Sequence, residues 1–133
     1  MKNNRATSKF VVVLNSEKIL EYYRDRPLSD QQLLDIEATN KKLDQGIQVS
    51  GQWIEHPTDS DKAIFMASQL ISSLLAENDA RTAISCAFLA TQYPNLKQLR
   101  AASQQDHISI ELINDKEFVE QTPIQFIAKK DLR

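Results

Sequence analysis

Residues 79–93 constrain the fold most, because their apolar side chains recur on nearly every side of a helix. The apolar members are Ala80, Ala83, Ile84, Ala87, Phe88, Leu89, Ala90 and Tyr93, and only Arg81, Ser85 and Gln92 suit a solvated edge. A helix that is apolar nearly all round is a core helix. Alanines let neighbouring backbones approach closely, so we expect this helix to form an antiparallel hairpin with an apolar helix over residues 60–77.

The only cysteine of the chain, Cys86, lies in the middle of this segment. Its helical neighbours include Ala83, Ala87 and Ala90, and apolar burial raises the pKa of a thiol and disfavours the thiolate. A nucleophilic cysteine instead needs a cation or a helix N-terminus nearby and a histidine within reach. The pattern therefore predicts that Cys86 is a packing residue.

Runs of β-branched and alternating apolar residues predict the strands. Residues 9–14 (KFVVVL) are typical of a central strand buried on both faces, and residues 107–113 alternate as in a half-buried strand. Residues 47–57 indicate an extended segment. Residues 117–128 are either edge strands or an arm that docks on a partner, since Pro123 interrupts them.

Three further helices are expected. One covers residues 16–26 after an N-cap at Asn15 or Ser16, a second covers 31–45 with a capping box from Ser29 to Gln32, and a short third covers 94–105. With only two glycines and four prolines in 133 residues, helix should dominate. We expect an α+β fold: a helix-rich single domain over 1–133, with four or five helices packed on a small sheet of about three to four strands. Residues 1–8 and 129–133 are expected to be flexible tails.

The number of cysteines and the length of the apolar runs indicate the cellular compartment. A single cysteine forms no internal disulfide, and the unbroken apolar run from Phe10 to Leu14 is too short for a secretory signal. Polar residues interrupt the longest apolar region, Ala63 to Leu75. We expect a cytoplasmic protein that does not enter membranes.

The stretch WIEHPTDSD carries the densest chemistry. Glu55, His56, Asp59 and Asp61 could ligate a divalent metal or another small ligand, but Thr58, Asp59 and Ser60 also suit a helix N-terminus, which is the favoured interpretation. His107 follows Asp106 and is expected to be a solvated histidine at a strand end.

A second alternative site combines aromatic and basic residues. Tyr22, Tyr23, Arg24 and Arg26, with the basic ends of the chain, could bind single-stranded nucleic acid. Glu17, Glu21 and Asp25 dilute that charge, and the net charge of −2 lacks the positive excess of nucleic-acid-binding proteins, so this function is the less expected one.

The function favoured by the sequence is binding. No catalytic motif is present, and we expect neither enzymatic activity nor a cofactor. Trp53 either covers the edge of the core, which its residue type favours, or anchors a partner. With Phe118 and Phe126 it supplies spare apolar surface. We therefore expect a small cytoplasmic regulatory or adaptor protein that acts through protein–protein interaction, most simply as a homodimer.

Overall fold

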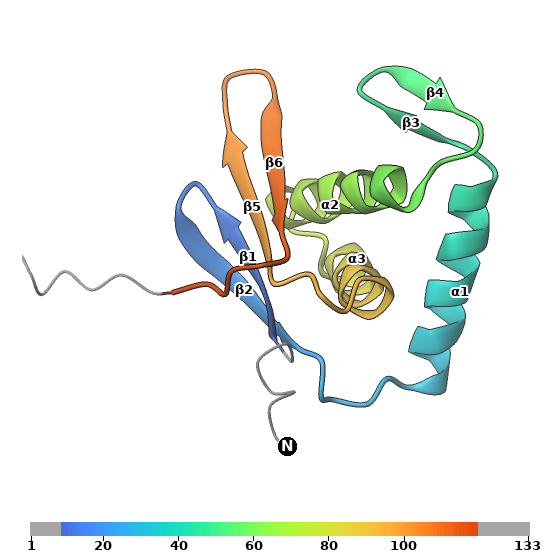
Figure 1. Ribbon diagram of the computed structural model, residues 1–133, viewed down its shortest axis with the longest axis horizontal. Coiled ribbons are helices and arrows are strands. Elements are labelled where there is room, and N and C mark those ends of the chain that lie inside the picture. Colours follow the sequence, from blue (N-terminus) through green and yellow to red (C-terminus); the bar gives the residue numbers. More distant parts are fainter. Residues whose placement is uncertain (1–8, 120–133) are drawn as a thin grey trace, which may run out of the picture.

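The computed structural model of the chain describes residues 9–119. Its elements in chain order are β1 (Lys9–Leu14), β2 (Glu17–Tyr23), α1 (Asp30–Asp44), β3 (Ile47–Val49), β4 (Gln52–Ile54), α2 (Asp59–Leu75), α3 (Asp79–Gln92), β5 (Gln98–Ser103) and β6 (Ile108–Ile113). Figure 1 shows a main sheet with α2 and α3 beside it, α1 beyond α3, and the β3–β4 hairpin at the far end of α1.

The main sheet has four strands in the order β2-β1-β5-β6. β1 lies parallel to β5, with Val11 opposite Gln98, and each of these central strands continues into an antiparallel hairpin. Phe10, Val11, Val12 and Val13 of β1 are all buried. The prediction of a central strand at residues 9–14 is therefore confirmed.

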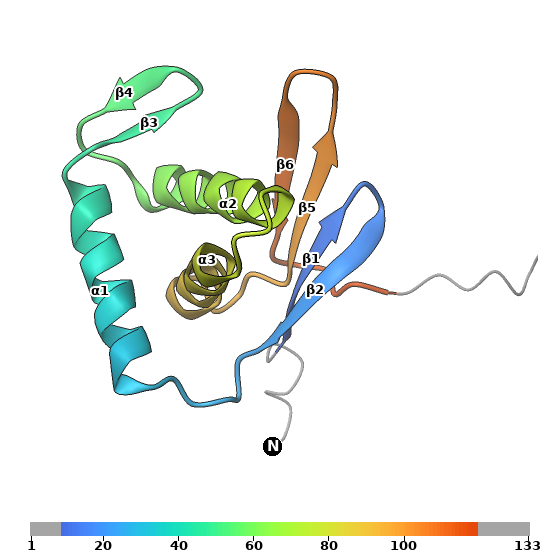
Figure 2. The ribbon, with the colours of Figure 1, turned by 180° about the vertical axis from the view of Figure 1, so that it is seen from behind.

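The helices cover one face of this sheet. Phe10, Val12 and Leu99 belong to the same core cluster as Leu70, Ile71, Phe88 and Leu89 of α2 and α3. In both views α2 lies across the picture and α3 is seen nearly along its axis, so the two helices cross (Figure 2). Even so, the Tyr93 hydroxyl at the end of α3 donates a hydrogen bond to the carbonyl of Asp59 at the start of α2, so the two helices run in opposite directions, as expected. Both helices occupy the core as predicted.

Residues 114–119 cross the other face of the sheet. The side chain of Gln98 on β5 donates a hydrogen bond to the carbonyl of Lys116, and the Lys18 ammonium on β2 lies 5.8 Å from the centroid of the Phe118 ring. Figures 1 and 2 show this segment running over β5 and β1 towards β2. It explains how Val11 and Val13 are buried on the face opposite the helices.

The predicted count of elements is wrong. Within residues 9–119 the chain has three helices and six strands in two sheets, instead of four or five helices on one sheet of three to four strands. The segments expected as helices at 16–26 and 94–105 contain β2 and β5. The predicted tails at 1–8 and 129–133, and the stretch 120–128, lie outside the described residues.

The misassigned segment at 16–26 is a strand because of the turn before it. Asn15 and Ser16 have φ angles of 53° and 70°, which is the left-handed geometry of a two-residue hairpin turn. The Asn15 side chain also accepts a hydrogen bond from the backbone N–H of Ser103. These contacts direct the chain back along β1, with Leu20 and Tyr22 packed against the core.

The ends of the three helices agree with the sequence. Ser29 and Gln32 form the predicted capping box of α1, and Thr58 caps α2. Asn78 caps α3. No helix among residues 9–119 combines the length and the apolar character that crossing a bilayer requires.

Candidate functional site

The β3–β4 hairpin presents Trp53 on its outer face. Ser50 and Gly51 have φ angles of 51° and 78°, so both adopt the left-handed conformation of a tight hairpin turn. Gln48 pairs with Trp53 across the two strands. Ile47 and Ile54 pair on the other face, where they pack on the core, so Gln48 and Trp53 are left facing solvent.

Gly46 holds the indole of Trp53 in place. The residue has a φ of +119°, and a Cβ atom built on it would lie 2.2 Å from Cζ2 of Trp53. The indole therefore rests directly on the glycine backbone, which only glycine permits at this distance and φ. Trp53 is nevertheless 61% exposed, so the expectation that it covers the core edge is not met.

Trp53 lies at a groove with a volume of about 610 Å³ between α1, the hairpin, α2 and α3. The apolar lining residues are Leu43, Ile47, Trp53, Phe65, Met66 and Ile84, and the polar ones are Thr39, Gln48, Gln69 and Ser85, with Lys42 and Arg81 as the charged members. Ile84, like Trp53, is a large apolar residue left exposed. The groove thus combines an apolar surface with polar groups at its margin, as binding sites in proteins commonly do.

The charge of the groove is positive. Lys42 comes from the last turn of α1 and Arg81 from the first turns of α3, and no carboxylate is among the lining residues. No ion pair within residues 9–119 engages either side chain. By contrast, the Lys62 ammonium beside this region pairs with Asp44.

The predicted ligand residues of the 53–61 stretch do not converge. Glu55 and His56 are exposed after β4, and the Asp61 carboxylate accepts the backbone N–H of Thr58, 2.9 Å away, as part of the helix cap. The backbone carbonyl of Asp59 accepts a hydrogen bond from the Tyr93 hydroxyl. Among the described residues there is no group of three or more His, Cys, Asp or Glu side chains placed to share a metal ion.

The aromatic and basic residues at 22–26 make contacts within the chain. Tyr22 is half-buried against the core, whereas Tyr23 lies between the Arg26 guanidinium, 5.6 Å from its ring centroid, and the Lys9 ammonium at 6.0 Å. The Arg24 guanidinium donates hydrogen bonds to the carbonyls of Ala90 (2.9 Å), Tyr93 (3.1 Å) and Leu96 (2.5 Å). Arg24 thus caps the C-terminal end of α3, and its donors point into the protein.

The remaining predicted residues lie apart from the groove. Phe118 is half-buried beside Lys18 on the far side of the sheet, and Phe126 lies outside the described residues. Cys86 is buried, and desolvation raises the pKa of its thiol to about 12, opposed only weakly by the charge of Arg24. The prediction that Cys86 is a packing residue is confirmed.

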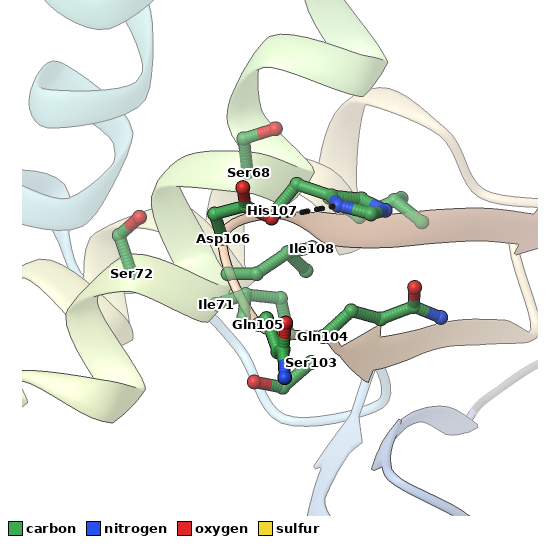
Figure 3. A pocket seen from close by; sticks show the side chains of 10 residues that line it. Ser68, Ile71, Ser72, Ser103, Gln104, Gln105, Asp106, His107 and Ile108 are labelled. Atoms are coloured by element: carbon green, nitrogen blue, oxygen red, sulfur yellow. Dashed lines mark ion pairs between the residues drawn. The ribbon is translucent and has the colours of Figure 1, made fainter.

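A second, more polar pocket of about 370 Å³ lies between α2 and the turn joining β5 to β6 (Figure 3). Ser68 and Ser72 project from α2, and the Asp106 carboxylate lies 3.7 Å from Nδ1 of His107, with both side chains largely solvated. Neither serine hydroxyl hydrogen-bonds to His107. The arrangement lacks the chain of contacts that activates a serine, so His107 is the solvated strand-end histidine that was expected.

Trp53 is recognisable in the sequence as a candidate binding residue, but the other residues of the groove are not. Lys42 and Arg81 are far apart in the chain and meet only through the packing of α1 near α3. The signals that could have located the groove are Gly46 and the Ser50–Gly51 turn, which together define a hairpin after α1. No known protein family, curated protein or solved structure matches the chain.

Proposed function

We propose that the protein is a small, non-catalytic regulatory or adaptor protein that binds a partner protein through the groove at Trp53. The observation that carries the proposal is the exposure, 61%, of an indole that rests against the backbone of Gly46. Tryptophan is enriched among the residues that dominate binding energy at interfaces. An indole that is already positioned loses little freedom on binding.

The chemistry of the groove favours binding over catalysis. Its lining residues include no histidine, cysteine or carboxylate. General acid–base and nucleophilic catalysis need such groups within reach of a substrate. Amide, hydroxyl and apolar side chains instead suit recognition.

The groove is a better candidate for the interaction site than the sheet edges, which a homodimer formed by pairing of edge strands would use. β2 and β6 are the two edge strands, and they carry Glu17, Lys18, Glu21 and Glu111. Charged residues on an edge strand oppose pairing with another chain. The proposal therefore rests on the groove rather than on edge pairing.

A selection from a displayed random-peptide library tests this proposal. The full chain, Trp53→Ala and Leu34→Ala would be panned in parallel, because Leu34 is another exposed apolar residue, 57% exposed, that does not line the groove. We expect peptides enriched on the wild type and on Leu34→Ala to be lost on Trp53→Ala. Equal enrichment on Trp53→Ala, or none on the wild type, would argue against the groove.

A further inference from the structure

We infer that the segment recognised by the Trp53 groove is an acidic one, with carboxylates next to apolar side chains. This inference rests on the proposed function and specifies the partner's chemistry. Lys42 and Arg81 are the charged residues of the lining, on two different helices. Apolar groups between them would contact Trp53 and Ile84 while carboxylates reach the two cations.

Lys42 and Arg81 differ from Lys62, the other cation near the groove, because no carboxylate within the described residues pairs with them. Lys62 pairs with Asp44, and Lys9 and Lys18 both pair with Glu21. Lys42 and Arg81 have no such ion pair, although the chain as a whole has a net charge of −2. A carboxylate from a partner would supply the missing charge locally.

The polar residues of the groove favour a peptide segment. The side-chain amides of Gln48 and Gln69 both line the groove, and neither has a hydrogen-bond partner among residues 9–119. An amide both donates and accepts, which matches the N–H and C=O groups of a peptide backbone. Leu43, Phe65 and Met66 provide the apolar surface for side chains of that segment.

A nucleic acid fits these features less well. Non-specific binding to a phosphate backbone requires many cations along a track, whereas this groove has two in a chain of negative net charge. The groove surface is also mainly apolar, which suits leucine or phenylalanine side chains. The partner is therefore assigned as a protein segment.

Three capped hexapeptides would test the inference. Each alternates leucine or phenylalanine with one polar residue, which is glutamate in the first peptide, glutamine in the second and lysine in the third. Trp53 is the only tryptophan of the chain, so its fluorescence reports binding at the groove. We expect the glutamate peptide to bind about tenfold more tightly than the glutamine peptide, and the lysine peptide to bind most weakly. Added salt should reduce the difference.

Matched charge reversals separate a local effect from net charge. In Lys42→Glu/Arg81→Glu the preference should invert in favour of the lysine peptide. The control, Lys41→Glu/Lys116→Glu, changes the net charge equally at exposed positions that do not line the groove, and it should keep the wild-type order. Lys41 and Lys42 both lie in the last turn of α1, so each of the two variants removes one cation from the C-terminal end of this helix and places a carboxylate there.

The outcomes distinguish this inference from the proposed function. If all three peptides bind equally at Trp53, the groove still binds peptides but the acidic preference is wrong. Inversion in both double variants, or tighter binding of an oligothymidylate than of the glutamate peptide, also overturns the inference. If the glutamate peptide does not bind, the inference fails, and the library selection then shows separately whether the groove binds any peptide.

Discussion

Replacing Gly46 with alanine should perturb the site in two separable ways. The φ of +119° is unfavourable for a residue with a Cβ atom, at a cost of about 1–3 kcal/mol in the free energy of unfolding. The new methyl group would also lie 2.2 Å from Cζ2 of Trp53, so the indole must leave its position. Both effects lower stability, but only the second depends on Trp53.

The second effect can be bounded from the exposure of Trp53. Because the residue is 61% exposed, about two-fifths of a side chain of roughly 250 Å² is covered, or about 100 Å². At about 25 cal/mol per Å², displacing the indole costs at most about 2.5 kcal/mol. Gly46→Ala should therefore lower the free energy of unfolding by about 1–5 kcal/mol in total.

A double-mutant cycle with Trp53→Ala measures this coupling. Urea unfolding followed by far-ultraviolet circular dichroism would compare the wild type, Gly46→Ala, Trp53→Ala and the double variant. We expect Gly46→Ala to be milder by about 1–2 kcal/mol when Trp53 is already absent. If Gly46→Ala costs the same in both backgrounds, the indole does not rest on Gly46 and the preorganisation argued for the groove is refuted.

Three other predictions follow from contacts away from the groove. Arg24→Met should lower the free energy of unfolding by about 2–4 kcal/mol because the carbonyls of Ala90, Tyr93 and Leu96 each lose a charged donor, while Arg26→Met should change it by less than about 0.5 kcal/mol, and urea titration compares the two. Cys86 should react with an aromatic disulfide reagent about a hundredfold or more slowly in native than in denatured protein, and equal rates would contradict its burial. The hydrogen bond from Lys18, followed by that from Tyr23, lowers the pKa of Glu21 to about 2, so its stabilisation is present above its ordinary pKa of 4.5 and is lost as the pH falls towards 2. The melting temperature of Glu21→Gln should consequently fall less than that of the wild type over this range, and parallel curves would contradict the assigned pKa.

Local signals in the sequence predicted the helix boundaries well. Ser29 and Thr58 cap helices as predicted, because a capping side chain acts on backbone N–H groups two or three residues away. The packing of Cys86 and the central position of β1 also followed from apolar patterns along single segments. These features depend on residues close together in the chain.

The segments that were predicted incorrectly are those whose secondary structure depends on pairing with residues far away in the sequence. β2 carries Leu20 and Tyr22 on one face, but its neighbours Ile19 and Tyr23 also suit a helix. The turn before it has Ser16 at a position of positive φ where glycine is the usual residue, so the sequence lacks the common Asn-Gly signal of a hairpin. In β5, alanine, glutamine and arginine favour helix, but pairing with β1 and β6 overrides that preference.

The candidate site also combines a residue that the local sequence marks with residues that only the tertiary packing brings together. Trp53 was identified as a possible anchor because of its size, and its exposure depends on the hairpin register. Lys42 and Arg81 are ordinary surface residues of their own helices, so nothing in the neighbouring sequence marks them. Only the packing of α1, α2 and α3 brings both to one groove.

The parallel pairing of β1 with β5 has a consequence for synthesis on the ribosome. Val11 pairs with Gln98, so the partner of β1 is made 87 residues later, or about 4–17 seconds at ordinary translation rates. During that interval the nascent chain exposes the apolar run of β1 with only β2 available to pair with it. We expect this run to be a binding site for chaperones that capture extended apolar segments of growing chains, until β5 emerges and completes the centre of the sheet.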